Sequence, residues 1–137
     1  MGKSVGMTTP ETDLETLLKN LSPRLNAGEF VFLSLKDHLP ANVRPLATFH
    51  EWEGESVVLR VEQAETIGLK HGEETYAWIT LEVHSALDSI GLTVAVTAAL
   101  AAAGIPCNVV AGFHHDHLFV PYAVKEMAME VLEKLQK

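Results

Sequence analysis

The segment Gly91–Pro121 reads GLTVAVTAALAAAGIPCNVVAGFHHDHLFVP and contains the clearest structural pattern of the chain. Its alanine-rich first part favours a helix. Gly104 and Pro106 end that helix, because glycine is common just after a helix and proline cannot continue one. Two apolar runs follow, at 107–113 and 118–120, on either side of the polar sequence HHDH. The segment therefore predicts a helix followed by two strands that form a hairpin.

The residues on both sides extend this pattern. In the run 76–84, every second residue is apolar and the residues between them vary in polarity, which is the pattern of a strand with one buried face. Asp88 or Ser89 can cap the alanine-rich helix that follows. After the hairpin, apolar residues recur at helical spacing over 124–135, which predicts an amphipathic helix. The second half is thus expected to be strand, helix, strand, strand, helix.

The first half repeats this plan in a weaker form. Its patterns predict a helix at 12–21, a strand at 29–35, a hairpin of 46–52 and 56–61 that reverses near Gly54, and a short helix at 62–69. Prolines 40 and 45 interrupt the loop 36–45, where the second half has its alanine-rich helix, so the first module is degenerate. Residues 47–51 correspond weakly to 111–115. We expect a tail at 1–9, a degenerate module at 10–72 and a complete module at 73–137.

Composition excludes several classes of function. The chain has 137 residues, 47% of them hydrophobic and 20% charged, which suffices for a packed core. Its formal net charge of -8 disfavours a nucleic-acid partner. A single cysteine, Cys107, rules out an internal disulfide and a multi-cysteine zinc site and fits a reducing compartment, so a cytoplasmic location is expected. No apolar stretch is long enough to span a membrane, and no membrane partner is expected.

The segment Gly91–Pro121 also resembles the signature of the ACT domain, a small ligand-binding module of amino-acid-regulated enzymes. The similarity covers 75–137 and extends to stand-alone bacterial proteins with ACT domains, to aspartokinase and to the animal cytosolic arginine sensor; the first half resembles the companion domain. It implies an α+β fold of two ferredoxin-like modules, each an antiparallel sheet with helices on one face. Because the second module ends on a helix, its fourth strand must be absent or come from another segment, such as the first half.

The loop His84–Gly91 is the best candidate for a ligand site. A helix N-terminus offers unpaired N–H groups that suit a carboxylate, Asp88 could bind an ammonium group, and Gly91 would let the backbone approach the ligand. Asn108, a polar residue in an apolar strand, is expected to face the pocket, and the resemblance adds Asp116 as a polar contact. The predicted ligand-binding residues are His84, Ser85, Asp88, Ser89, Ile90, Gly91, Asn108 and Asp116. The alternative is structural: Asp88 or Ser89 only caps the helix, and Gly91 only packs.

Four side chains that can bind metals follow one another at His114–His117. In an extended chain, His115 and His117 share one side, whereas His114 and Asp116 share the other. Two ligands do not make a metal site, so metal binding by His115 and His117 is an alternative, and no cofactor is expected.

No catalytic motif is present, and Cys107 has no neighbouring base in sequence, so no catalytic residue is predicted. Our first hypothesis is a non-enzymatic regulatory or sensor protein. It would bind a small molecule, an amino acid above all, at a module interface, and would form a homodimer. Because Pro40 removes the corresponding helix from the first module, at most one such site per chain is expected. The alternatives are a metal-binding protein or small metal-dependent enzyme that uses His114–His117, and a ligand-free interaction module that uses sheet edges and the Trp78 face.

Overall fold

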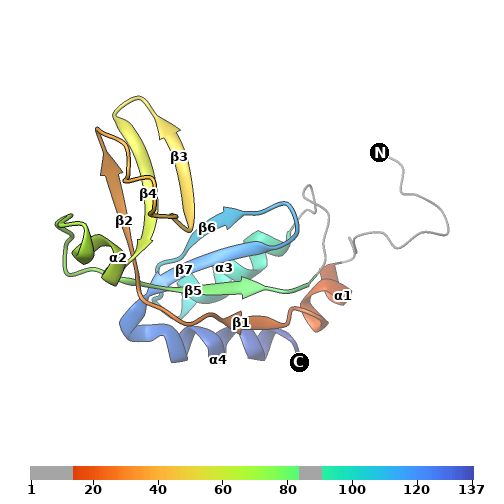
Figure 1. Ribbon diagram of the computed structural model, residues 1–137. Helices are drawn as coiled ribbons and strands as arrows, with labels where there is room; N and C mark the ends of the chain where they lie inside the picture. Colours follow the sequence, from red (N-terminus) through yellow and green to blue (C-terminus); the bar gives the residue numbers. More distant parts are fainter. Residues whose placement is uncertain (1–13, 84–90) are drawn as a thin grey trace, which may run out of the picture.

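The computed structural model describes residues 14–83 and 91–137 (Figure 1). Its elements follow the predicted order, with one additional short strand. They are α1 (Leu14–Lys19), β1 (Pro23–Leu25), β2 (Phe30–Leu35), β3 (Ala47–Glu51), β4 (Gly54–Arg60), α2 (Val61–Thr66), β5 (Tyr76–Leu81), α3 (Leu92–Ala102), β6 (Asn108–Ala111), β7 (Asp116–Pro121), a 3₁₀ turn (Tyr122–Val124) and α4 (Lys125–Leu135).

The described strands form one seven-stranded sheet in the order β3-β4-β2-β5-β7-β6, and β1 also pairs with β5. Each of these pairings is antiparallel. The two halves of the sheet meet where Phe30, the first residue of β2, pairs with Tyr76, the first residue of β5. In Figure 1, β2, β3 and β4 rise steeply from the plane of β5, β6 and β7, so the sheet is sharply bent at this junction.

The fourth strand of the second module comes from the first half of the chain. Strand β1 pairs with β5 from Pro23 opposite Leu81 to Leu25 opposite Ile79. The second module therefore contains the strands β1-β5-β7-β6, so of the two alternatives, an absent fourth strand or one from another segment, the structure shows the second. A strand that precedes residue 73 completes the sheet that follows it, so the two modules interlock.

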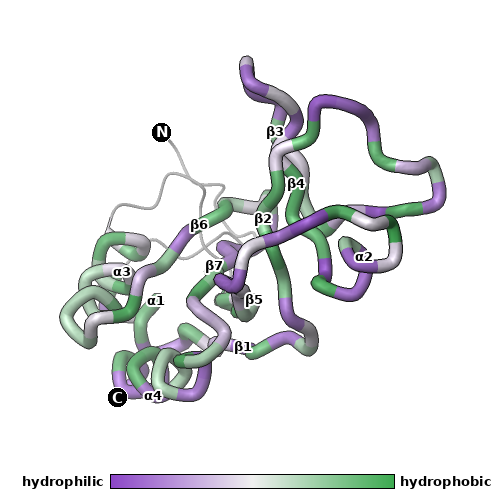
Figure 2. Tube along the Cα trace, turned by 90° about the vertical axis from the view of Figure 1, so that its left-hand side faces the viewer, coloured by the Kyte–Doolittle hydropathy of each residue, from purple (hydrophilic) through white to green (hydrophobic). Residues whose placement is uncertain are grey.

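The larger core lies between this part of the sheet and the helices α1, α3 and α4. Alternate residues of β5 and β7 point into it, namely Ala77, Ile79, Leu81, Leu118 and Val120. Helix α3 contributes Leu92, Val96 and Leu100, four residues apart, and each is at most 2% exposed. Figure 2 shows α3 in mainly hydrophobic shades, because alanine is the commonest of its remaining residues, whereas α4 is mixed. For α4, the apolar spacing that predicted the helix also identifies the face that it buries, whereas the alanine-rich composition that predicted α3 indicates no face.

The first module has a smaller core and lacks a helix after β2. Val31, Val57 and Leu59 pack against Ala64 of α2 on one face of the strands. Residues 36–46 contain no helix, as the prolines in this stretch predict. The predicted hairpin is present, with Trp52 and Glu53 as its two-residue turn, between β3 and β4.

The weak internal repeat holds for the hairpins but not residue by residue. Ala47 begins β3, whereas Ala111 ends β6. The hairpin of β3 and β4 is equivalent to that of β6 and β7. The turn of one corresponds to the turn of the other, whereas Ala47 and Ala111 do not correspond.

None of the helices in residues 14–83 and 91–137 combines the length and the hydrophobicity that a membrane span requires.

Candidate functional site

The predicted ligand loop lies largely outside the described residues, since these exclude His84, Ser85, Asp88, Ser89 and Ile90. Gly91 is described and precedes the first turn of α3. Its φ of 98° is a left-handed conformation that glycine adopts without strain. A Cβ atom at this position would lie 3.4 Å from the Leu14 side chain, so α1 packs close to the start of α3.

Asp116 lies at the same end of the second module. It is the first residue of β7 and pairs with Leu81, the last residue of β5. Its side chain is half-buried, and burial raises the pKa of this carboxyl, while the nearby His117 and His115 act in the opposite direction. Among the described residues, its carboxylate has no hydrogen-bond or ion-pair partner. A desolvated carboxylate without a cation at the end of a sheet can accept an ammonium group.

Asn108 does not share this location. It is the first residue of β6 and pairs with Phe119, whereas Asp116 pairs with Ala111 at the other end of the same strand. Phe119 and Leu118 alternate along β7, so Asn108 lies on the sheet face opposite the helical core. The structure therefore brings Gly91 and Asp116 to one end and leaves Asn108, an exposed residue, at the other.

The histidine-rich tip forms a tight turn. Phe113 and His114 are its two-residue loop, closed by a 2.9 Å hydrogen bond from the Gly112 N–H to the His115 carbonyl. The Nδ1 atom of His115 is buried without a hydrogen-bond partner, while His117 lies on the face opposite the helical core. Across residues 14–83 and 91–137, no three His, Cys, Asp or Glu side chains come together as metal ligands.

Cys107 packs against the larger core. Burial raises the pKa of its thiol to about 11, so the thiolate is scarce near neutral pH. This environment gives no support to a nucleophilic role.

A cavity of about 410 Å³ lies in the first module at the end of β2. It is lined by residues 34–40 together with Ile67 and Leu69. This is the position that corresponds to the predicted ligand loop of the second module, and it contains the exposed residues Lys36, Asp37 and His38. Because no helix follows β2 here, no helix N-terminus faces this cavity.

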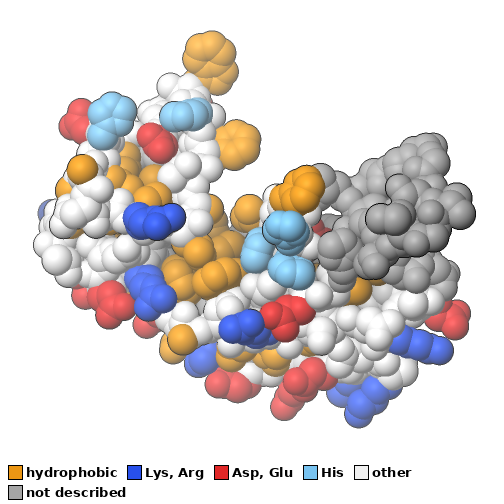
Figure 3. Space-filling model, turned by 45° about the vertical axis from the view of Figure 1, so that its right-hand side comes forward, with side chains coloured by type: hydrophobic (Ala, Val, Ile, Leu, Met, Phe, Trp, Pro, Cys, Tyr) orange, Lys and Arg blue, Asp and Glu red, His pale blue; other side chains and the backbone are white. Residues whose placement is uncertain are grey.

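A second concave surface lies between the modules, on the side of the sheet opposite the helices. We call it the inter-module groove; it is lined by Leu46 and Ala47 of the first module and by Trp78, Val110, His117 and Phe119 of the second. Its volume is about 230 Å³, and a smaller hollow of about 120 Å³ adjoins it through Ala47 and Val110. Figure 3 shows a hydrophobic floor between the upright first module and a group of histidines.

Sequence reasoning did not find the groove. The alternation in 76–84 does place Trp78 on the strand face opposite the uniformly apolar one. The bend of the sheet turns this face into a hollow, and no local sequence pattern indicates that bend. Ala47 and Val110 are 63 positions apart in the numbering and become neighbours through that bend.

Comparison with protein families matches two models, each described as an ACT domain, at residues 9–76 and 73–134. No curated protein matches. Among solved structures, a protein of unknown function from Vibrio cholerae, described as a possible transport protein, is 40% identical with a TM-score of 0.83 over 90% of this chain and 96% of that chain.

Two more distant structures share the fold. A protein from Agrobacterium tumefaciens is 19% identical with a TM-score of 0.58, covering 83% of this chain and 87% of that chain. The regulatory subunit of aspartate kinase from Thermus flavus is 10% identical with a TM-score of 0.58, covering 84% of this chain and 97% of that chain.

Proposed function

Because the chain belongs to the ACT domain family and carries two such domains in tandem, we propose that it is a regulatory protein that binds an amino acid. ACT domains commonly bind small molecules, and the half-buried Asp116 without a cation partner is the observation that carries the proposal for this chain. The ligand site is at the end of the second module where β5, β7 and the start of α3 meet, facing the neighbouring module of a dimer.

An amino acid complements the charges expected there. Its ammonium group binds the Asp116 carboxylate and replaces the water that burial has removed. Its carboxylate binds unpaired backbone N–H groups at the start of α3, directly after Gly91, since the first turn of a helix leaves such groups without partners. Asp88 provides a second contact to the ammonium group. His84, Ser85 and Ile90 complete the proposed loop, whereas Asn108 is better assigned to the opposite face.

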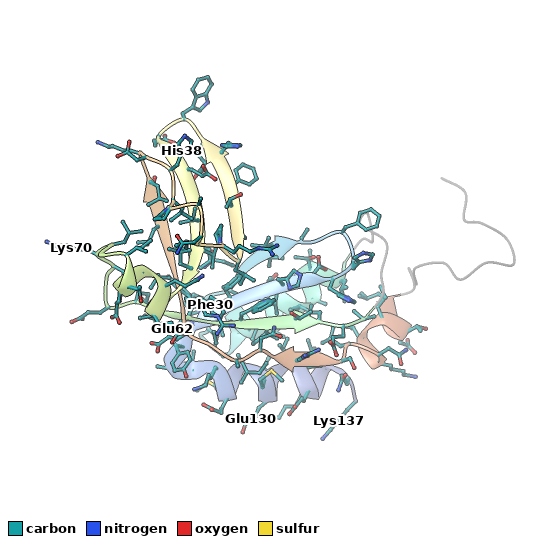
Figure 4. All side chains as sticks on the ribbon, in the orientation of Figure 1. Phe30, His38, Glu62, Lys70, Glu130 and Lys137 are labelled. Carbon is teal, nitrogen blue, oxygen red and sulfur yellow. The ribbon has the colours of Figure 1, made fainter. Side chains whose placement is uncertain are left out.

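A thermal-shift screen against the twenty amino acids tests this function. We expect one or a few related amino acids to raise the melting temperature, because a ligand that binds only the folded state stabilises it. The variant Asp116→Asn should lose that shift. The control is Glu130→Gln, the same chemical change at an exposed site on the outer side of α4 (Figure 4). A panel without any stabilising amino acid, or a shift that Asp116→Asn retains, would contradict the proposal.

We also propose that the protein acts as a homodimer in the cytoplasm and regulates a separate partner rather than catalysing a reaction. Support for self-association comes from three exposed aromatic side chains, namely Phe49, Trp52 and Phe113, which are 72%, 103% and 80% exposed. Large exposed apolar side chains near sheet edges are typical of interfaces. Analytical ultracentrifugation should give a dimer that Trp52→Ser combined with Phe113→Ser weakens. A wild-type monomer at micromolar concentration would contradict this part of the proposal.

A further inference from the structure

We propose that the inter-module groove is a second small-molecule site, distinct from the amino-acid site at Asp116, and that it takes a planar apolar molecule with one uncharged hydrogen-bond acceptor. The proposal stands on three observations: an apolar cavity formed jointly by the two modules, a histidine held in one tautomer at its wall, and a glycine that leaves this histidine uncovered.

The shape and lining of the groove favour a flat apolar ligand. Beneath it, the ring of Phe30 makes edge-to-face contacts with Trp78 and Phe119, at centroid distances of 5.8 and 6.3 Å. These aromatic contacts join the first and second modules, so the floor is part of a packed cluster. Figure 4 shows Phe30 at the junction of the two modules. A volume of about 230 Å³ is smaller than a typical drug-sized site, which suits a molecule of one or two fused rings.

The polar group in the groove wall is His117, and its neighbours fix its hydrogen position. The Trp78 Nε1–H donates to His117 Nδ1 at 3.0 Å, and the Thr80 hydroxyl lies 3.1 Å from the same nitrogen. The Asn26 side-chain amide donates to the Thr80 oxygen at 2.9 Å, which leaves the Thr80 hydroxyl hydrogen free to point at His117. Because Nδ1 accepts hydrogen bonds, the neutral ring carries its hydrogen on Nε2.

The other ring nitrogen is the donor that a ligand would meet. A Cβ atom at Gly112 would lie 3.1 Å from His117 Nε2, so any larger residue would crowd this atom. Among the described residues, Nε2 has no hydrogen-bond acceptor. Burial lowers the pKa of His117, with the charge of His115 as a second cause and Asp116 opposing both, so the ring is neutral at pH 7. A neutral N–H donor selects a carbonyl oxygen or a heterocyclic nitrogen.

Charge argues against an anionic ligand in this groove. None of the residues that line it is Lys or Arg, and the chain carries a formal net charge of -8. A carboxylate would lose its hydration there without gaining a cation. The groove therefore differs from the Asp116 site, where a carboxylate is available to bind a cationic group.

Calorimetric titration with coumarin and with quinoline, two planar molecules with one uncharged acceptor, tests the proposal. We expect both to bind, and we expect benzoate, an anion, and naphthalene, which has no acceptor, to bind at least about tenfold more weakly. The variant His117→Phe keeps an aromatic ring but removes the donor, so it should abolish the preference for coumarin over naphthalene. The variant Ala47→Phe fills the groove from the edge strand β3 and should abolish binding of all the probes. Circular dichroism confirms that each variant is folded.

Glu130→Gln, a change at an exposed site on α4 away from the groove, should leave coumarin binding unchanged. Absence of binding by both probes, or binding that His117→Phe and Ala47→Phe leave intact, would overturn the proposal. The proposal would also be overturned if the probes bound only after a dimer had been diluted to monomers. In that case a second copy of the chain, rather than a small molecule, occupies the groove.

Discussion

Leu25 pairs with Ile79 across 54 positions of sequence, in the register that joins β1 to β5. This pairing places a strand of the first half inside the sheet of the second ACT domain. Further bonds extend it at both ends, from the Asn26 N–H to the Trp78 carbonyl at 2.9 Å and from the Glu82 N–H to the Ser22 carbonyl at 3.1 Å. Tandem domains in sequence are thus interlocked in structure.

The fragment 73–137 should therefore fail to fold by itself, although a family model spans nearly all of it. Without β1, one edge of β5 has unpaired backbone groups, and Leu17 and Leu21, both fully buried, are missing from the core. Amide NMR spectra of the fragment should show little dispersion, whereas fragment 14–137 should give a dispersed spectrum. A well-dispersed spectrum from 73–137 would show that the interlocking is dispensable.

Leu100→Ala should lower the free energy of unfolding by about 2–5 kcal/mol, because Leu100 is fully buried between α3 and the sheet and its loss leaves a cavity. Val94→Ala, on the same helix, removes an apolar side chain that is 69% exposed and should change stability by less than about 0.5 kcal/mol. Chemical denaturation measures both. Equal effects of the two substitutions would mean that α3 buries a different face.

Gly54→Ala should destabilise the first module by more than about 2 kcal/mol. A Cβ atom there would lie 2.5 Å from the Leu35 carbonyl oxygen, and the φ of 154° adds backbone strain. Gly68→Ala is the matched control, since its φ of 74° also disfavours alanine but no atom lies within 4 Å of the added carbon. The control should cost only about 1 kcal/mol. Thermal denaturation of the two variants would refute the hairpin geometry if Gly54→Ala were the milder change.

His117 and His71 should affect stability with opposite dependence on pH. The pKa of His117 is lowered from 6.5, mainly by burial. Its contribution to the free energy of unfolding is therefore present above pH 6.5 and is lost as the pH falls. The pKa of His71 is raised by a hydrogen bond with the Gly72 carbonyl and another with Glu65, so its contribution is present below pH 6.5 and is lost as pH rises.

Unfolding free energies measured from about pH 5 to 8 test this pair. The variant His117→Gln should reduce the loss of stability on the acid side, and His71→Gln should reduce the loss on the alkaline side. The prediction is wrong if either variant changes the slope on the other side.

Local patterns were sufficient for most of the fold. An alanine-rich run that ends at Gly104 marks α3, an alternation of apolar residues marks β5, and Gly54 marks the turn of the first hairpin. Strand β1 was not predicted, because it has only three residues and begins with Pro23, so neither its length nor an alternation of apolar residues indicates a strand. It becomes a strand through its pairing with β5.

The candidate site was predictable in part for a similar reason. Asp116 and Gly91 belong to one end of the module because strand and helix order dictate it, whereas the face of Asn108 depends on the register between β6 and β7. The inter-module groove needs the bend of the whole sheet, which no single stretch encodes.

The most direct test of the account is calorimetric titration, at pH 7, of the amino acid that stabilises the protein most. We expect one ligand per chain, an affinity that falls at least about tenfold in Asp116→Asn, and no change in Glu130→Gln. The same affinity in wild type and Asp116→Asn, or no binding by any amino acid, would contradict the claim that this domain end holds the ligand's ammonium group.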